Sequence, residues 1–520
     1  MNGYTLQRNV NQISRNIITN VAVFGLNAII SLWSIPYLIS HLGVEGYGLI
    51  PLASQVVSYL TLVTLSLNGA IGRFIALDIQ KKDLVSAIKT FNTALTSGAA
   101  LSLLLLPFVA LIVIGLPYIF KIPSGLLGEA QILFILVIGR FIITIYEGIF
   151  STSSWALSRF DLRNIAIGIS KLSYPLLLIL TFGVIKPSLS SVGISIFLSG
   201  LIGLIGCIFL WRTLSPFLLI DFRKFDHIRI KEFFSIGGWM MVDQIGSLLF
   251  LSSDLIIINA YLGTKSGGEY GSILVISSTL RVLVLTISNV FTPIMIANYA
   301  KGDISTLVSI SKDLIKYSSL LLAIPVGLLV GTSKEFLGLW LGPPFSSLYI
   351  ILIVMLFHHP INLSVLPLQG IQVTLNKVRI PGVATLIVGV LNAILSVVLI
   401  QKWGVLGVAL SCAITLSIKS IFFTLFYNEK ILNIPNLTLI KELAPGVLST
   451  LIFSVITFII SEIIHPATWV TLFIEVLSLG LLFLGVLYYL FMKPELKRLT
   501  KDYWGNRQSK ISLEVNLSID

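Results

Sequence analysis

The sequence predicts an all-α polytopic membrane protein with fourteen transmembrane helices. Of its 520 residues, 56% are hydrophobic and 11% are charged, whereas about 25% of residues are charged in soluble domains. The mean hydropathy is +0.97. Fourteen spans of about 20 residues need about 280 residues, which leaves room for short connections only. Functions that need a large domain outside the membrane are therefore disfavoured.

Apolar runs long enough to cross a bilayer follow one another along the whole chain. The first run is too long for a signal-peptide core and no small-residue cleavage site follows it, so we expect it to remain as a span. In chain order the runs are residues 17–39, 47–67, 93–115, 130–153, 165–185, 192–211, 236–262, 270–295, 317–337, 348–371, 380–400, 405–427, 443–464 and 470–492.

The Lys and Arg residues between these runs alternate in number from loop to loop. Those on one side of the membrane total 26, those on the other side total 5, and four lie within spans. A missed or extra span would scramble this asymmetry, so the positive-inside rule places both termini in the cytoplasm. The formal net charge of +12 then reflects topology, and we expect no nucleic-acid partner.

Short motifs of the first half of the chain recur in the second half. Leu42-Gly43 and Tyr47-Gly48 recur as Leu262-Gly263 and Tyr270-Gly271, at offsets of 220 and 223, and Val192-Gly193 recurs as Leu406-Gly407. Parallel repeats of this kind are related by an axis along the membrane normal and hold a site between them near the midplane. We expect two pseudo-symmetric six-helix bundles at residues 1–212 and 236–428, a basic linker at 213–235, two extra helices at 429–492 and a basic cytoplasmic tail at 493–520.

The linker alternates basic and aromatic side chains. It contains Arg223, Lys224, Arg229 and Lys231 together with Phe217, Phe222, Phe225 and Phe233. Such a segment can lie on the anionic inner leaflet, and a plain tether is the alternative.

Two acids lie inside the seventh run. Asp243 and Asp254 are eleven positions apart, so on one continuous helix they share a face, with Ser247 between them, and lie about 16 Å apart along the axis. Carboxylates at that depth are costly and mark functional sites.

Several segments resemble a known family. They are ISRNIITNVAVFGLNAIISLWSIPYLISHLGVEGYG, NGAIGRFIA, DLIIINAYLGTKSGGEYG and EFLGLWLG, within residues 14–430. In order and spacing these resemble polysaccharide flippases, the Wzx-type members of the MOP exporter superfamily. The resemblance implies a V-shaped pair of bundles that exports an isoprenoid-diphosphate-linked oligosaccharide, such as an O-antigen, capsule or exopolysaccharide unit, across the inner (cytoplasmic) membrane. It implies no cofactor, metal or catalytic residue. Membrane lipids and the polymerase and chain-length proteins of the same pathway are the expected partners.

A diphosphate inside a membrane protein needs cations in a hydrated cavity. The candidates for substrate binding are Arg140, Arg281, Arg73, Asn20 and Asn27, and those for ion coupling are Asp254, Asp243 and Glu147. Matching depths along neighbouring spans predicts the pairs Asp254–Arg281, Glu147–Lys171 and Asp243–Lys419, which leaves Arg140 over. Arg140 is therefore the first choice for the diphosphate or an acidic sugar, with a structural role as the alternative.

Two further polar patterns leave alternatives open. Asn16, Asn20, Asn27 and Ser31 keep one face of the first helix polar, either for the cavity or for hydrogen bonds between helices. His358 and His359 precede Pro360 in the tenth run, where a kink with one satisfied imidazole is favoured over a titrating group.

The absence of a P-loop motif disfavours ATP-driven transport by this chain and favours an ion gradient or the membrane potential. A multidrug or cation antiporter of the same superfamily is one alternative. A polytopic membrane glycan polymerase or acyltransferase is another, although the longest external stretch, 116–129, is short. The two terminal spans lie outside the repeat, and we expect them to contact the lipid tail.

Overall fold

The computed structural model describes residues 3–157, 159–227, 229–230 and 238–493, and this part is helical, without strands. Twelve of its helical segments are long and apolar enough to cross a membrane. The α-helices are α1 (Gly3–Gln80), α2 (Leu84–Ile119), α3 (Leu127–Phe150), α4 (Thr152–Ala156), α5 (Phe160–Val184), α6 (Leu189–Leu214), α8 (Gly238–Leu251), α9 (Ser253–Leu262), α10 (Thr264–Ala300), α11 (Ile304–Gly331), α12 (Ser333–Leu341), α13 (Tyr349–Phe357), α14 (His359–Asn362), α15 (Leu368–Thr374), α16 (Arg379–Ile418), α17 (Phe426–Leu432), α18 (Thr438–Ile464) and α19 (Trp469–Leu487).

Two of the twelve segments each contain two helices joined at a kink. In α1 the kink is at Gly43, with φ 71° and ψ 170°, and in α16 it is at Gly404, with φ 56° and ψ −137°. Residues with a side chain rarely adopt these angles, so glycine allows the sharp change of direction. Both kinks fall between runs that the sequence separates, 17–39 from 47–67 and 380–400 from 405–427.

The predicted run 236–262 is not one helix. Its described part is divided at Ser252 into α8 and α9, and Asp254 lies in the first turn of α9. The prediction of a continuous helix is therefore wrong. An acidic side chain is favourable at a helix N-terminus, where the backbone amides carry partial positive charge. Asp254 therefore stabilises the start of α9 after the break.

The predicted kink at the His pair is confirmed. A 3₁₀ turn (Pro343–Leu348) leads into the tenth run, and α13 ends at Phe357 before the short α14 and α15. Pro360 lies in the first turn of α14, where its missing N–H costs no helical hydrogen bond.

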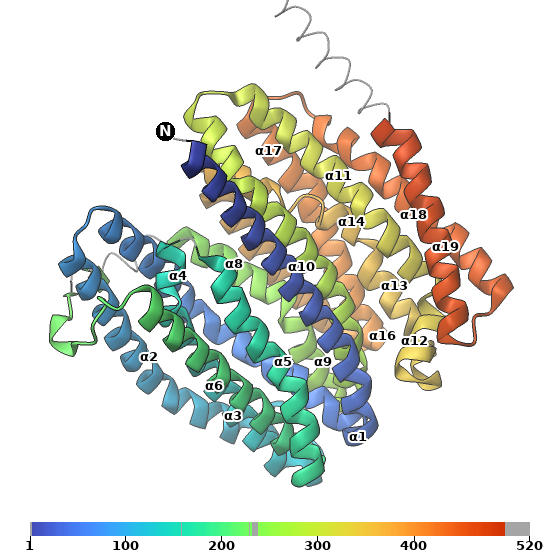
Figure 1. The fold of residues 1–520 in the computed structure, drawn as a ribbon. Helices are drawn as coiled ribbons and strands as arrows, with labels where there is room; N and C mark the ends of the chain where they lie inside the picture. The colour runs from blue at the N-terminus through green and yellow to red at the C-terminus, as the bar shows by residue number, and fades with distance from the viewer. Residues whose placement is uncertain (1–2, 158, 228, 231–237, 494–520) are drawn as a thin grey trace, which may run out of the picture.

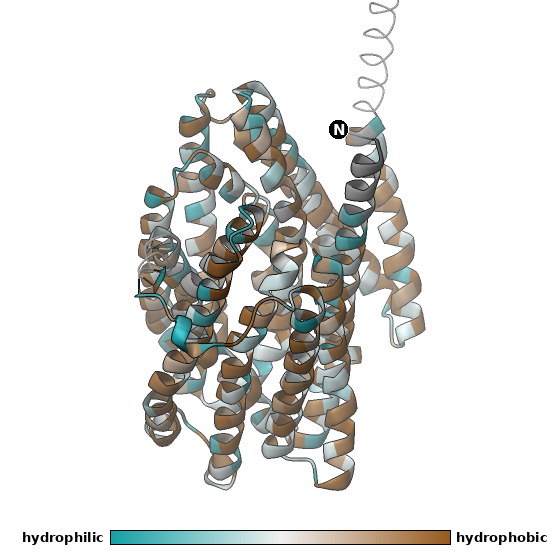
Figure 2. Cartoon of the chain, turned by 60° about the vertical axis from the view of Figure 1, so that its left-hand side comes forward, coloured by the Kyte–Doolittle hydropathy of each residue, from teal (hydrophilic) through white to brown (hydrophobic). Residues whose placement is uncertain are grey.

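The helices form two groups joined by α1 (Figure 1). Helices α2 to α6 lie on one side and α10 to α17 on the other, with α18 and α19 along the outer edge of the second group. Helix α1 packs against both α5 and α10. Figure 2 shows apolar residues along most of the helices and hydrophilic residues gathered in connecting segments. Any site between the groups is therefore bordered by α1.

The two groups meet where the repeated glycine motifs lie. A Cβ atom on Gly48 would lie 2.1 Å from the Thr264 carbonyl oxygen, and one on Gly268 would lie 2.3 Å from the Val44 carbonyl oxygen. Gly48 and Gly268 are related by the smaller of the two offsets, as are Gly43 and Gly263, both of which have positive φ. The larger offset, which paired Tyr47-Gly48 with Tyr270-Gly271, is therefore out of register. Equivalent glycines of the two repeats contact one another.

Helix caps follow the same offset. Asp83 caps α2 by accepting the Ser86 amide, and Asp303 caps α11 by accepting the Thr306 amide. The two aspartates occupy equivalent positions of the repeat. Helices α2 and α11 therefore begin with the same kind of N-cap, an aspartate side chain, in both halves.

The linker is bonded to α2. The side chain of Asn92 donates to the Leu219 carbonyl oxygen at 2.8 Å and accepts the Asp221 amide at 2.6 Å, and Thr93 accepts the Asp226 amide at 3.0 Å. Beyond it, Arg229 pairs with Asp78 of α1 at 3.2 Å. The described linker is thus docked on the first group, which neither the leaflet interpretation nor the plain tether anticipated. Lys231 and Phe233 lie outside the described residues.

Candidate functional site

The carboxylate of Asp254 is buried among neutral donors. Its side chain is 3% exposed. One oxygen accepts Asn392 Nδ2 at 3.1 Å and Ser396 Oγ at 3.4 Å, and the other accepts Tyr270 Oη at 3.2 Å. These donors come from α10 and α16. No basic side chain pairs with Asp254 in the described part of the chain, so the predicted Asp254–Arg281 pair is wrong.

The Asn392 amide is held by the returning arm of α16. Its oxygen accepts Ser411 Oγ at 3.0 Å and Thr415 Oγ1 at 3.1 Å. The kink at Gly404 brings these two residues back beside Asn392. The amide therefore has a fixed orientation, with its NH₂ group toward Asp254 and its oxygen toward the two hydroxyls.

A cavity of about 220 Å³ lies beside this acid in the second half. Asp254, Arg281 and the His pair line it, and Gln55 of α1 closes one side. His359 Nε2 lies 2.8 Å from Ser277 Oγ, and His358 is hydrogen-bonded to Asn362. Both histidines are buried, at 8% and 4% exposed. Arg281 and Asp254 thus share a cavity without forming an ion pair.

A smaller cavity of about 50 Å³ adjoins it and contains Asp243, Ser247 and Lys419. The two cavities share Phe250 and Arg281. Arg281 lies 5.9 Å and Lys419 Nζ 5.5 Å from the centre of the Phe250 ring. Lys419 donates to Thr385 Oγ1 at 2.7 Å, and no ion pair joins it to Asp243 in the described residues. The predicted Asp243–Lys419 ion pair is therefore also wrong, although both residues line the same cavity.

The first half contains its own charged cavity, of about 270 Å³, between α3, α5 and α6. Three cations, Arg140, Arg163 and Lys171, and one acid, Glu147, line it. Arg140 pairs with Glu147 at 3.1 Å and donates to Thr144 Oγ1 at 2.7 Å. The cavity lining therefore carries more positive than negative charge.

The pairing inside this cavity differs from the prediction. Lys171 does not pair with Glu147; its Nζ donates to Asn27 Oδ1 of α1 at 2.7 Å. Arg140, predicted to be left over, is the partner of Glu147. The reason lies in α6: Gly200 and Gly203 have no side chains, and Cβ atoms there would lie 2.2 Å from Arg140 Cδ and 2.4 Å from Glu147 Oε1. The ion pair occupies the space that these glycines leave.

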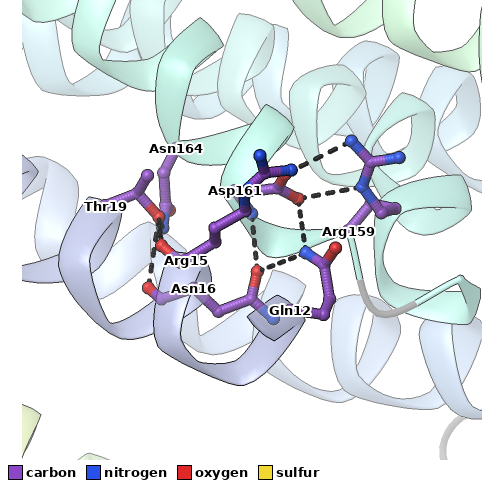
Figure 3. Close-up of polar contacts among 7 residues, drawn as sticks. All are labelled: Gln12, Arg15, Asn16, Thr19, Arg159, Asp161 and Asn164. Atoms are coloured by element: carbon purple, nitrogen blue, oxygen red, sulfur yellow. Dashed lines mark hydrogen bonds and ion pairs between the residues drawn. The ribbon is translucent and has the colours of Figure 1, made fainter. Parts of the chain in front are cut away.

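The polar face of the first helix bonds to α5 (Figure 3). Asn16 accepts the Asp161 amide at 2.9 Å, and Thr19 accepts Asn164 Nδ2 at 3.0 Å. Outside this view, Asn20 also accepts Asn164 Nδ2 at 3.0 Å. Asp161 also receives Gln12 at 2.9 Å and Arg159 at 3.0 Å. The structure thus supports the alternative of hydrogen bonds between helices. Asn20 and Asn27 are nevertheless exposed, so one side of each remains open.

Several residues of these sites are not among the residues predicted from the sequence. The sequence places Arg163 in a loop, and Tyr270, Asn392 and Ser396 carry no charge to attract attention. Neutral partners recur in every apolar span, so only contact with Asp254 distinguishes them. Arg73 is a predicted substrate-binding residue, and its side chain lies outside the described residues. No group of three or more His, Cys, Asp or Glu side chains able to hold a metal occurs in the described part.

Known proteins resemble this chain in sequence. Over 441 residues it is 28% identical to the uncharacterised membrane protein EpsK of Bacillus subtilis (strain 168), which covers 84% of this chain and 87% of EpsK. Over 194 residues it is 25% identical to the probable low-salt glycan biosynthesis flippase Agl15 of Haloferax volcanii, which covers 37% of this chain and 40% of Agl15.

Solved structures show the same fold. An inward-facing multidrug resistance MATE family transporter of the MOP superfamily has a TM-score of 0.63 at 15% identity, covering 79% of this chain and 94% of that transporter. The lipid II flippase MurJ in an inward closed conformation has a TM-score of 0.59 at 18% identity, covering 91% of this chain and 99% of MurJ.

A model of the family described as polysaccharide biosynthesis protein matches residues 13–299, which is more than half of the chain. This protein therefore belongs to the polysaccharide biosynthesis protein family and has the fold of MOP superfamily transporters.

Proposed function

We propose that this protein moves an isoprenoid-diphosphate-linked oligosaccharide from the inner to the outer leaflet of the cytoplasmic membrane by alternating access. Membership of a polysaccharide biosynthesis family and the fold shared with a lipid II flippase support a transporter of lipid-linked glycans. An O-antigen, capsule or exopolysaccharide unit is the expected cargo. The polymerase and chain-length proteins of such a pathway are the expected partners.

The observation that carries this proposal is the excess of cations in the first-half cavity. Arg140, Arg163 and Lys171 surround a space of about 270 Å³ in which Glu147 is the one acid among the lining residues. A diphosphate is multiply charged and matches guanidinium and ammonium donors. Because Glu147 is already bonded to Arg140, Lys171 and Arg163 are the cations that a diphosphate would meet.

The proposed topology has fourteen crossings with cytoplasmic termini. It follows when the two kinked segments, Ile18–Leu62 and Arg379–Leu432, are each taken as two crossings. The six-helix bundles then correspond to residues 1–212 and 236–428. In this orientation the Gly48–Gly268 contact closes the external end, so the space between the bundles faces the cytoplasm, where the cargo is made.

We place ion coupling at Asp254. A carboxylate 3% exposed with neutral donors alone is a natural site for a cation, because it lacks a protein counter-charge. An ion gradient or the membrane potential then supplies the energy. Asp243 and Arg281, in the adjoining cavity, lie on the route between Asp254 and the cytoplasm.

The decisive experiment uses purified protein in vesicles with a fluorescent isoprenoid-diphosphate oligosaccharide in one leaflet. We expect leaflet exchange above that of protein-free vesicles, and faster exchange when a cation gradient is imposed. A protein with Asp254→Asn is the control for coupling. Export of a cationic dye without movement of the glycolipid would reject the proposal.

That outcome would identify a cation antiporter, the second candidate. Asp254 and the MATE-like fold favour it, since a buried acid suits a cationic cargo, whereas the cations of the first half do not. For a glycan polymerase or acyltransferase the His pair is the one favourable feature, and both imidazoles are buried and hydrogen-bonded. The flippase family of its relatives points to transport and away from catalysis.

We further propose that α18 and α19 contact the lipid tail of the cargo. Their outward faces carry exposed large apolar residues such as Leu448, Ile452, Phe473 and Leu481. A photoactivatable lipid-tail probe is expected to label these helices, as measured by peptide mass spectrometry. Labelling confined to the first twelve spans would contradict this.

A further inference from the structure

The terminal helix pair contains a buried acid that no proposed transport step uses. Glu475 of α19 is 4% exposed, and neither carboxylate oxygen has a hydrogen-bond partner among the described residues. Two buried hydroxyls of α18, on Thr457 and Ser461, also have none. The Ser461 hydroxyl lies beside the carboxylate, without the geometry of a hydrogen bond. Thr457 lies one helical turn before Ser461 on the same face of α18, and we call these three unpartnered groups the Glu475 cluster.

Packing holds this cluster closed. Leu472, Glu475, Leu479 and Phe483 share the buried stripe of α19. Phe483 stacks on Phe453 of α18 with ring centres 3.9 Å apart, which seals the side toward the cytoplasm. Opposite, Gly331 of α11 would place a Cβ 2.4 Å from Thr457 Cβ, so α11 and α18 are in close contact there.

Positive charge is absent from the described surroundings of Glu475. The outer half of α11, residues 318–331, has no charged residue. Helix α12 contributes Glu335, an acid in electrostatic range, and its neighbour Lys334, which is exposed. At the outer end of α18, Glu462 and His465 are both exposed. No ion pair joins Glu475 to any described cation.

An ionised carboxylate in such a place would lack both solvent and a counter-charge, so the neutral acid is the stable form. A protonated carboxyl can donate its proton to one hydroxyl and accept from another. Ser461, beside the carboxyl, and Thr457, one turn away, are the unpartnered hydroxyls of α18. A proton also needs no cavity, because it is carried on a carboxyl oxygen, whereas a metal cation would need space between the closely packed side chains.

We propose that Glu475, Ser461 and Thr457 form a proton-binding site between the terminal helices, distinct from Asp254. The proton stays bound while α19 packs on α11 and α18. Separation of α19 exposes Glu475 to external water, where it ionises and releases the proton. The packing of the terminal helices therefore responds to external pH.

Dicyclohexylcarbodiimide tests the site, because this apolar reagent forms an acylurea with protonated carboxyls within membranes. Full-length protein in vesicles is treated over a pH series, and adducts are quantified by peptide mass spectrometry. We expect Glu475 to be labelled near neutral pH. Above its titration midpoint, the extent of labelling should fall about tenfold per pH unit, because the protonated fraction falls at that rate. Exposed Glu462 is the internal control and should remain unlabelled.

A second measurement separates a proton site from a merely buried acid. The melting temperature of the wild type in detergent should fall as pH rises, whereas Glu475→Gln, a neutral isostere, should lose that dependence and melt no lower. Ser461→Ala should strengthen the wild-type dependence, and Ser454→Ala, whose hydroxyl bonds the Thr450 carbonyl, should not.

Three results would overturn the proposal. One is labelling of Glu475 no greater than that of Glu462 at every pH. Another is a melting temperature of Glu475→Gln well below wild type, which would mean that the ionised form is needed. The last is protection from labelling by Na⁺ and not by choline, which would make sodium the ligand.

Discussion

The two halves share a backbone plan and differ in how they hold charge. In the first half, three cations and one acid line a cavity, and among the described residues Lys171 donates to the neutral Asn27 and pairs with no acid. In the second half, the described partners of the buried Asp254 are all neutral donors. Ser34, the counterpart of Asp254 in the first repeat, donates its hydroxyl to the Ser31 carbonyl oxygen and holds no charge.

The two halves are alike in their backbone features and differ in their charged side chains. The shared features are backbone devices: glycine kinks, aspartate caps and the glycine contact between halves. The charged side chains that differ line cavities within each half. Under the proposed function, the first-half cavity would receive the anionic cargo and Asp254 of the second half would bind the coupling cation.

The largest effect is expected at Asp254. Asp254→Asn keeps the shape and an acceptor for Asn392, so the protein should fold, but glycan transport should fall by about tenfold or more because the cation site is lost. Asp243→Asn, on a half-buried residue, should impair transport much less. Complementation of surface glycan at matched protein levels measures both. Unimpaired complementation by both variants would break the proposed division between the halves.

The next effect tests the first-half cavity. Lys171→Ala should leave thermal stability near wild type and lower transport about tenfold, because Lys171 has no acid partner to leave unpaired. Arg140→Ala should destabilise by about 1–3 kcal/mol, less than a fully buried pair would, since the paired side chains are partly exposed. This reverses the expectation from the sequence, which made Arg140 the free cation.

Melting in detergent and transport in vesicles should be measured on the same preparations, with the exposed Lys402→Ala as control. A stable, inactive Arg140→Ala beside an unstable Lys171→Ala would restore the assignment made from the sequence.

A smaller effect is expected where the halves touch. Gly48→Ala places a methyl group against the Thr264 carbonyl, which should lower stability by about 1–3 kcal/mol and hinder closure of that end. Gly268→Ala should behave alike, because it is the equivalent position. Gly25→Ala, with no atom near its Cβ, is the control. If all three variants melt and transport alike, the contact between halves is not a tight one.

The smallest effect compares the equivalent caps. The hydroxyl and amide of Thr306 lower the pKa of Asp303 to about 2, whereas the Ser86 amide lowers the pKa of Asp83. Stability from a lowered pKa is present above the ordinary value of 3.8 and is lost as pH falls toward the folded value. Asp303 also accepts Ser305 and Thr306 hydroxyls, so Asp303→Ala should lower the melting temperature more than Asp83→Ala. The difference should shrink as the pH approaches 2; a constant difference would exclude the ionised cap as its cause.

The helical membrane class, most of the apolar segments, the recurrence of short motifs between the two halves and the charged residues within spans can all be read from the sequence. These follow from one-dimensional quantities: the length of apolar runs, the spacing of motifs and the distribution of loop charge. The kink at the His pair was also readable, because Pro360 acts on the local backbone, and the kinks at Gly43 and Gly404 fall where the sequence separates two runs.

Which side chains meet depends on how the helices pack. Depth along a helix is one coordinate of three, so depth matching paired Glu147 with Lys171 and Asp254 with Arg281. The rotation and approach of each helix depend on packing: Gly200 and Gly203 admit the Arg140–Glu147 pair, and the break at Ser252 turns Asp254 toward Asn392. The contact of Gly48 with Gly268 likewise arises only when two surfaces distant in the chain come together, which no local pattern encodes.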